Sequence, residues 1–396
     1  MKNIIHIAID GREANSKSRV GSNVYAFEIL LGLYRLLEKR DDIKVTVLTA
    51  SKINSDLPLA TENWSYKTFG PKKFWTQWAL PIHLFQYQTE YDVFFTPGHY
   101  APRISAIPYV SSVMDTAYLE FPNQFKKSDT LKLTKWTKYS VKNAKKVIAI
   151  SKYTKNEIIK NYHKPQEDIV IAYPAINTTK LRIKAKEVND FFKKQKITEP
   201  YILFVGTLQP RKNLVKLIEA FEIFSRMKAG RELKRKNQLT KNRSKVKLVL
   251  AGKIGWLADD IFKKINSSPL KTKIITTGFV TESEKQILYK YASASCLVGT
   301  HEGFGIPPLE SLNFGTPAIV SNTTSLPEVV ESAGFLVDPN SAQDIANKIW
   351  EVYSMPTREK GLFRKKARQQ VKKFNWNNSA KIILNVLIDV YQKISN

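Results

Sequence analysis

Two glutamates eight positions apart, Glu302 and Glu310, are the residues of this chain best suited to chemistry. Between them lie a Gly-Phe-Gly turn and the prolines Pro307 and Pro308. Proline fits the first turn of a helix, so the spacing predicts a helix that starts near these prolines, with Glu310 in its first turn. Unpaired N–H groups at such a start attract anions. The segment therefore suits a nucleotide-sugar, although Glu310 could instead only favour the helix dipole.

A second candidate segment, residues 206–213, has the sequence Gly-Thr-Leu-Gln-Pro-Arg-Lys-Asn and follows a predicted strand. Arg211 and Lys212 directly precede a predicted helix, where the dipole disfavours cations. A bound anion would explain them, because arginine can fork two phosphate oxygens and lysine adds a mobile charge. The alternative is two exposed basic residues in a basic protein.

The first half of the chain offers weaker candidates. Gly21 precedes a predicted helix and could let the backbone approach a ligand, while His99 and Asp115 each follow a predicted strand. The chain has no Gly-x-Gly-x-x-Gly fingerprint, so dinucleotide binding is not expected. It also has no Asp-x-Asp pair and no zinc-ligand spacing, so no metal is expected.

Short apolar runs alternate with helix-length segments, which is typical of parallel sheets in α/β proteins. The pattern restarts near residue 200, after the polar stretch 177–199. We therefore predict two Rossmann-like domains, 1–180 and 181–376, facing across a cleft that binds the ligand at the carboxyl ends of the strands. A final helix within 377–396 could return to the first domain. Strands are expected at 4–9, 45–49, 93–96, 109–113, 147–150, 169–173, 201–205, 246–250, 274–276, 295–298, 318–320 and 334–337, and helices at 22–38, 130–143, 154–161, 214–224, 283–291, 309–314, 342–353 and 377–394.

The net charge of +28 implies attraction to acidic partners. Residues 228–247 hold nine Lys and Arg against one acid, Glu232, which predicts a basic surface loop. A solvated insertion is the favoured interpretation, followed by contact with an anionic membrane. Nucleic-acid binding is not expected, because no recognised motif accompanies the charge.

Aromatic residues gather between positions 64 and 87, with Lys72 and Lys73 among them. Such a mixture suits a membrane interface, but packing of a helix onto the first domain is favoured. No apolar run approaches the roughly 20 residues of a membrane span, and the first residues lack the features of a signal peptide. The single cysteine, Cys296, fits a reducing compartment. These features predict a cytoplasmic protein, with contact at the inner face of the membrane left open.

The chain resembles glycosyltransferase family 4, which comprises retaining enzymes of the GT-B architecture. The resemblance covers nearly the whole length and is most specific at 302–310, at 206–213, and from Gly315-Thr316-Pro317 to 325–329. Softer similarities lie at 151–154, 121–122 and 374–376. The resemblance implies metal-independent, retaining transfer of a sugar from a GDP- or UDP-linked donor to a glycan or lipid-linked acceptor in polysaccharide or glycoconjugate synthesis. The Pro-Arg-Lys-Asn sequence of the donor loop, residues 210–213, favours mannose as the sugar.

The resemblance also implies roles for single residues. Arg211 and Lys212 would bind the donor diphosphate, Glu310 the ribose and Glu302 the donor sugar. Many family members have histidine where this chain has Met114, which can neither donate a hydrogen bond nor shuttle a proton. The implied catalytic residues are Glu302, Arg211, Lys212 and Asp115; the implied donor-binding residues also include Gly206, Thr207, Gly303, Phe304, Gly305, Ile306, Leu309 and Glu310; and Gly21, Ser22 and His99 would lie on the acceptor side.

Two other functions stay open. One is a nucleotide-sugar epimerase of the same fold, which would convert a donor with no acceptor present. The other is a basic protein that has lost catalysis and binds a membrane or nucleic acid, for which Met114 is the best support. A glycosidase fits poorly, because the two acids would hold opposite ends of a donor instead of flanking one bond.

Overall fold

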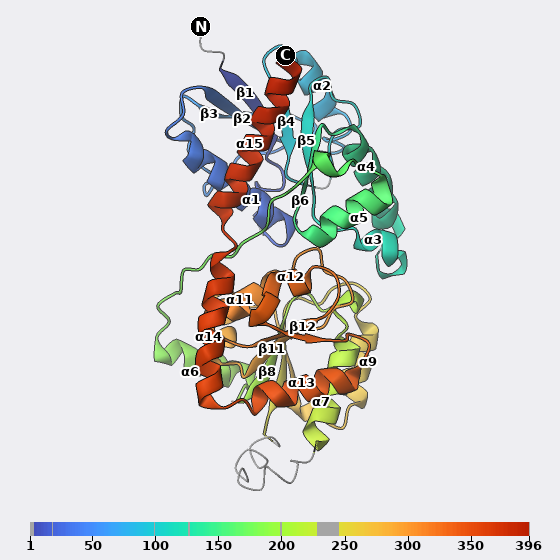
Figure 1. The fold of residues 1–396 in the computed structure, drawn as a ribbon, viewed down its shortest axis with the longest axis vertical. Coiled ribbons are helices and arrows are strands. Elements are labelled where there is room, and N and C mark those ends of the chain that lie inside the picture. The colour runs from blue at the N-terminus through green and yellow to red at the C-terminus, as the bar shows by residue number, and fades with distance from the viewer. Residues whose placement is uncertain are drawn as a thin grey trace. The chain divides into compact units, whose positions relative to one another are not determined.

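The computed structural model describes residues 4–17, 19–98, 100–125, 127–198, 200–227 and 245–395. The chain forms two compact units, Met1–Ala175 with Phe374–Asn396, and Ile176–Lys373. Each unit contains one parallel sheet with helices around it (Figure 1). The predicted α/β class with two Rossmann-like parallel sheets is confirmed.

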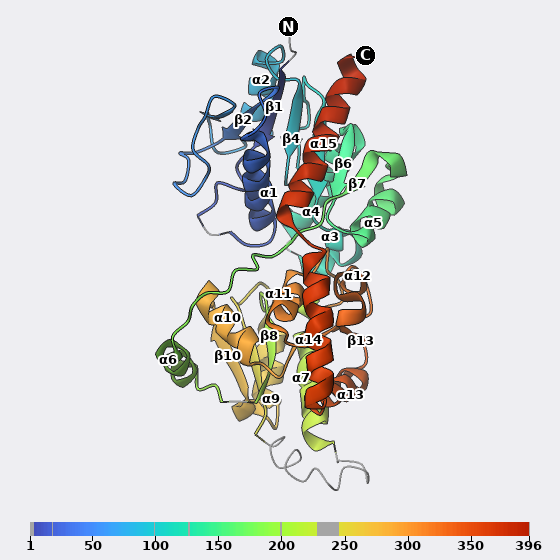
Figure 2. The same ribbon diagram turned by 60° about the vertical axis from the view of Figure 1, so that its left-hand side comes forward.

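The first unit has a seven-stranded sheet in the order β3-β2-β1-β4-β5-β6-β7. Helices α2, α4 and α5 contribute to one core cluster, which also contains Phe94 and Val113 from the sheet. Helices α1 and α15 pack against each other and α15 contacts β1, β4 and β6 (Figures 1 and 2). The strands are β1 (Ile5–Asp10), β2 (Ile43–Thr49), β3 (Trp64–Thr68), β4 (Val93–Thr96), β5 (Tyr109–Val113), β6 (Lys146–Ala149) and β7 (Ile169–Ile171), and the helices are α1 (Ser22–Leu37), α2 (Ala79–Gln86), α3 (Ala117–Glu120), α4 (Lys127–Asn143), α5 (Lys152–Tyr162) and α15 (Trp376–Ser395).

The final helix, α15, packs on the first unit. A Cβ on Gly32 of α1 would lie 2.6 Å from the Cβ of Ala380, so only glycine allows the two helices to approach this closely. The Ser379 hydroxyl donates to the carbonyl of Tyr173 at 2.5 Å. The last 23 residues (374–396) therefore belong structurally to the unit in which the chain begins.

The second unit has a six-stranded sheet in the order β10-β9-β8-β11-β12-β13. Strands β8 and β12 are almost wholly buried, as parallel strands covered on both faces are. The strands are β8 (Tyr201–Val205), β9 (Lys247–Ala251), β10 (Ile274–Gly278), β11 (Ala294–Leu297), β12 (Ala318–Ser321) and β13 (Phe335–Val337), and the helices are α6 (Ala185–Gln195), α7 (Leu214–Arg226), α9 (Asp259–Ser267), α10 (Glu282–Tyr291), α11 (Ile306–Phe314), α12 (Leu326–Val330), α13 (Ala342–Tyr353) and α14 (Thr357–Lys372).

The structure departs from the sequence-based prediction in several elements. The predicted strands and helices are present, with ends shifted by at most a few residues. Strand β3 and helices α3, α6, α9, α12 and α14 were not predicted, and α2 was expected only as a helix without bounds among the aromatic residues. Helix α6 occupies part of the polar stretch expected to link the domains. The basic segment 228–247 lies outside the described residues except for its end, 245–247. Among the described residues, no helix combines the length and the hydropathy that a bilayer crossing requires.

Candidate functional site

Neighbouring strands of the second sheet carry the two predicted segments at their carboxyl ends. Strand β8 leads through a short 3₁₀ turn, Pro210–Lys212, into α7, and the loop after β11 contains Glu302. The Lys212 ammonium forms an ion pair with Oε1 of Glu302. Only 8% of Lys212 and 7% of Glu302 is exposed, so this ion pair is buried. The fold thus brings together two residues that are 90 positions apart.

Gly299 allows these two loops to touch. A Cβ at this position would lie 2.9 Å from the carbonyl oxygen of Arg211 and 3.3 Å from Oε1 of Glu302. The N–H of Thr300 also donates to the Arg211 carbonyl at 3.1 Å. Sequence reasoning did not select Gly299, although a glycine directly after a predicted strand was a usable signal.

Arg211 and Lys212 stand immediately before α7, as predicted. Asn213 joins them to the helix in the left-handed region, with φ 56°. Its side-chain N–H groups donate to the carbonyls of Val298 at 3.0 Å and Pro339 at 2.7 Å, which fixes the turn. With the Gln209 amide oriented so that its oxygen faces Arg211, this oxygen accepts from the Arg211 Nε at 2.7 Å. Hydrogen bonds of Asn213 and Gln209 therefore fix the turn that contains Arg211 and Lys212.

The Gly-Phe-Gly turn is equally constrained. Gly305 has φ 105°, and a Cβ there would lie 2.5 Å from Cδ2 of Leu326, so the turn needs glycine. The Ser325 hydroxyl lies 2.8 Å from the carbonyl oxygens of both Glu302 and Phe304. No described side chain caps the start of α11. The turn therefore delivers the chain into a helix whose first N–H groups have no side-chain cap.

Glu310 lies in the second turn of α11, because the helix begins at Ile306; the predicted position in the first turn is wrong. Two residues of α10 bind its carboxylate. The Lys285 ammonium lies 2.5 Å from Oε1, and the Tyr289 hydroxyl donates to Oε2 at 2.9 Å. Lys285 also pairs with Glu282 at 2.8 Å. Burial alone would lower the pKa of Lys285, but the charges of Glu310 and Glu282 raise it, so the lysine stays charged.

The first unit has its own candidates at the carboxyl end of its sheet. Gly21, with φ 54°, precedes α1, and the Ser22 hydroxyl donates to Glu13 at 3.2 Å. Asp115 follows β5 and accepts the N–H of Ala117 at 3.3 Å. Burial, with further contributions from the negative charges of Asp129, Glu13 and Asp115, raises the pKa of Tyr100. Sequence reasoning missed Glu13.

Two other residues of the first half, His99 and Met114, do not add a functional group to the described site. His99 lies outside the described residues. Met114 is buried, with 7% exposure, directly before Asp115. A methionine in that position contributes packing but no proton transfer.

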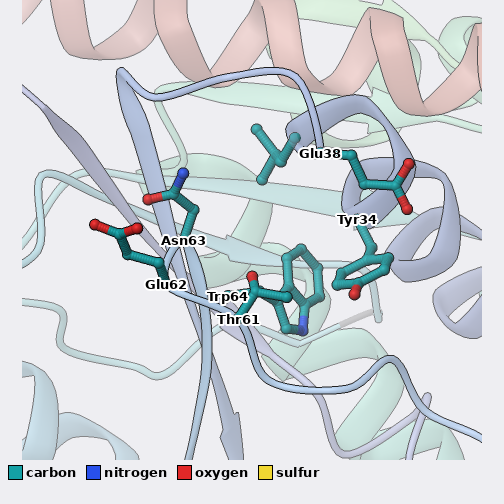
Figure 3. A pocket seen from close by; sticks show the side chains of 7 residues that line it. Tyr34, Glu38, Thr61, Glu62, Asn63 and Trp64 are labelled. Atoms are coloured by element: carbon teal, nitrogen blue, oxygen red, sulfur yellow. The ribbon is translucent and has the colours of Figure 1, made fainter.

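A hollow in the first unit lies elsewhere (Figure 3). It is lined by Tyr34 and Glu38 at the end of α1 and by residues 61–64, which lead into β3. In an α/β unit a helix runs back antiparallel to its strand, so the end of α1 lies at the amino edge of the sheet. Ligands of such sheets bind at the carboxyl edge. This hollow contains none of the predicted site residues and is not the candidate site.

Across the described part of the chain, no group of three or more His, Cys, Asp or Glu residues could hold a metal ion. The Lys212 ammonium pairs with Glu302, and Arg211 precedes Lys212 in the same 3₁₀ turn.

Comparison with known proteins identifies the family. Residues 186–374 match the profile of glycosyl transferases group 1, and residues 21–180 match that of glycosyltransferase family 4. Together the two profiles cover most of the chain, which belongs to glycosyltransferase family 4. It is a glycosyltransferase with the GT-B fold.

Similar proteins include O-antigen chain mannosyltransferase B of Escherichia coli, 27% identical over 324 residues, with 81% of this chain and 78% of that protein covered. O-antigen chain mannosyltransferase RfbU of Salmonella typhimurium is 28% identical over 219 residues, covering 55% of this chain and 54% of that protein. Two solved structures share the fold. Anabaena Alr3699/HepE in complex with UDP has a TM-score of 0.68 at 15% identity and covers 98% of this chain and 100% of its own. WaaG, a glycosyltransferase involved in lipopolysaccharide biosynthesis, has a TM-score of 0.67 at 14% identity, with 97% and 99% covered.

Proposed function

We propose that this glycosyltransferase transfers mannose, with retention of configuration and without a metal ion, from a nucleotide-linked donor to a glycan or lipid-linked acceptor in polysaccharide synthesis. Relatives named as O-antigen chain mannosyltransferases support the sugar and the pathway class. GDP is the first base to test and UDP the second, because the Anabaena structure of the same fold holds UDP. A lipid-linked acceptor would bring the protein to an anionic membrane surface, and the cytoplasmic location stays a prediction.

The buried ion pair between Lys212 and Glu302 is the observation that carries this proposal. Glu302 is held beside Arg211 and next to the Gly-Phe-Gly turn that starts α11. Cations and helix N–H groups would stabilise a departing diphosphate, since charge grows there as the bond breaks. The Glu302 carboxylate would accept a hydrogen bond from a hydroxyl of the donor sugar, and the Glu310 carboxylate would accept one from a hydroxyl of the ribose.

The proposed reaction breaks the bond between the anomeric carbon and the diphosphate oxygen and forms a bond from the same carbon to the acceptor oxygen, on the same face of the sugar. The acceptor hydroxyl loses its proton, which passes to the departing phosphate oxygen. This route suits a chain in which Met114 cannot serve as a base. Asp115 would then orient the acceptor by accepting a hydroxyl hydrogen bond.

The test is an assay with GDP-mannose, UDP-sugars and a soluble oligosaccharide acceptor, with the anomeric configuration of the product determined by NMR. Arg211→Ala and Glu310→Ala should each weaken donor binding or turnover by about 100-fold, a loss typical of a missing charged contact. Lys263→Ala, an exposed change on α9, is the control. Wild-type transfer by both site variants would refute the assignment.

Two further measurements separate the alternatives. EDTA should leave turnover unchanged, and loss of turnover with rescue by a divalent cation would refute metal independence. A donor converted to another sugar without any acceptor would indicate an epimerase. An inverted product would refute retention while leaving the family assignment intact.

A further inference from the structure

The aromatic cluster of residues 64–87 divides into a buried and an exposed set. Trp64 and Trp75 are 1% exposed and pack inside the first unit, which fits the favoured sequence interpretation. Trp78 and Phe85, in contrast, are each 65% exposed, and Ile82 between them is 54% exposed. The favoured interpretation therefore explains only the buried set.

The exposed set forms one face of a helix. Trp78 immediately precedes α2, and Ile82 and Phe85 follow four and seven positions later, so the three side chains share a side. The opposite side of α2, with Leu80 and Leu84, packs into the core of the unit. Helix α2 is thus apolar on both sides, which burial in this unit alone does not require.

Phe74, four residues before Trp78, is a further exposed aromatic residue. It is 59% exposed and has φ 58°, a conformation that bulky residues rarely adopt. The Lys73 ammonium lies 5.4 Å from its ring centre. A strained backbone that holds an aromatic ring in solvent is the kind of feature found at functional surfaces.

Lysines predominate near the apolar face in the sequence, with Glu62 and Glu90 at the two ends of the segment. Residues 63–89 contain Lys67, Lys72 and Lys73 and no acid. Helix α4, whose Val141 belongs to the same core cluster as Leu80 and Leu84, lies on the same side of the sheet. Its outward stripe, at helical spacings of three and four, consists of Lys127, Leu131, Lys135, Lys138 and Lys142.

We infer that α2 and α4 dock the first unit on a bilayer that contains anionic phospholipid. Trp78, Ile82, Phe85 and Phe74 would enter the interfacial region, and the lysine stripe of α4 would face the headgroups. Aromatic rings and lysine stems suit this interface, and each lysine adds attraction to anionic lipid. A partner protein or a nucleic acid could also bind the lysines, but four large exposed apolar side chains on the same unit favour a lipid surface. The inference specifies the membrane contact of the proposed function.

The test measures co-sedimentation of the full chain with phosphatidylcholine vesicles, with and without phosphatidylglycerol, at low and high salt. Binding should require phosphatidylglycerol and weaken with salt. The triple variants Lys135→Gln/Lys138→Gln/Lys142→Gln and Trp78→Ser/Ile82→Ser/Phe85→Ser should each lower the partition constant on the order of 100-fold.

Matched controls lie in the second unit. The exposed Lys365, Lys366 and Lys372 of α14 give a triple glutamine variant with the same change in charge, and Leu362→Ser removes an apolar side chain that is 54% exposed. These variants should bind vesicles within about twofold of the wild type, since they lie outside the proposed surface. Circular dichroism melting shows which variants are folded.

Several outcomes would overturn the inference. They are no binding to phosphatidylglycerol vesicles, equal losses in the α14 control, and a dimer in sedimentation velocity that the α2 variant abolishes. Preference for single-stranded DNA over vesicles would also overturn it. Transfer to a soluble acceptor should be unchanged in the α2 and α4 variants, so failure of vesicle binding and failure of the proposed transfer reaction are separate results.

Discussion

Replacing Lys212 with methionine tests whether the ion pair with Glu302 is as buried as the structure shows. Methionine keeps a side chain of similar length, so packing changes little, but the ammonium is lost. The Glu302 side chain would then keep its 7% exposure without the ammonium that pairs with it. Removing one member of a buried pair costs about 3–5 kcal/mol, because the remaining charge is poorly solvated.

The double variant Lys212→Met/Glu302→Gln separates charge from packing. With both charges removed, the loss should shrink to about 1–2 kcal/mol, so the two changes are strongly non-additive. Transfer should nevertheless stay abolished, because the proposed chemistry uses both groups. A double variant that regains stability but not activity would indicate that Lys212 and Glu302 both take part in the reaction.

Hydrogen exchange followed by mass spectrometry is the assay, because the chain has two units and a single global unfolding free energy is not well defined. Amides of β8 and β11, the strands that carry the pair, report the second unit. Lys263→Met is the control, since that lysine pairs with Asp260 at 3.2 Å with both side chains largely exposed, and it should cost less than about 1 kcal/mol. Wild-type protection in Lys212→Met, or equal losses in the single and double variants, would refute the reasoning.

Three further predictions concern the two units separately. Lys285→Met should raise the Kd of GDP or UDP by about tenfold, because the contact that orients Glu310 is lost. If Glu310 binds the ribose hydroxyls, calorimetry with 2′,3′-dideoxy analogues, which lack those hydroxyls, should show no such change. Gly299→Ala should weaken nucleotide binding by at least about tenfold, because its Cβ meets the Arg211 carbonyl at 2.9 Å; unchanged calorimetric affinity would contradict the close approach. Burial, with a smaller effect of Lys67, lowers the pKa of His83 to about 4 from 6.5, so its neutral form stabilises the first unit above pH 6.5 and this stability is lost as the pH falls toward 4. His83→Phe should remove up to about 3 kcal/mol of that pH dependence, measured by hydrogen-exchange protection of first-unit amides, and an unchanged pH profile would count against it.

The sheets were predictable because most of their strands are buried on both faces. Strands such as β8, with the sequence Tyr-Ile-Leu-Phe-Val, appear as short apolar runs between turns. Strand β3 was missed because it lies at the edge of its sheet and only Trp64 is buried in it. Helix α14 was missed because it is rich in Lys and Arg and buries few side chains. Where burial is partial, the apolar pattern is too weak to identify the element.

The candidate site was only partly predictable, for a different reason. Local signals placed Arg211 and Lys212 before α7 and a glycine turn before α11, and the structure has both. The partners of Glu310 come from α10, 21 and 25 residues away, and no local pattern announces them. The error in the turn that holds Glu310 arose because α11 begins one residue before its first proline. Contacts between elements depend on the fold, which spacing along one element does not reveal.

The lysines that pair with Glu302 and Glu310 suggest how one site could bind both sugar hydroxyls and a diphosphate. Two carboxylates suit the hydroxyls, but their negative charge would repel the phosphates. Lys212 offsets Glu302 and Lys285 offsets Glu310, so each carboxylate keeps its acceptor oxygens while its charge is compensated. Arg211 and the uncapped start of α11 then supply the positive potential. Glu302→Gln should therefore reduce turnover more than it reduces the affinity for the free nucleoside diphosphate, and a larger loss of GDP or UDP affinity would show that Glu302 orders the phosphate site instead.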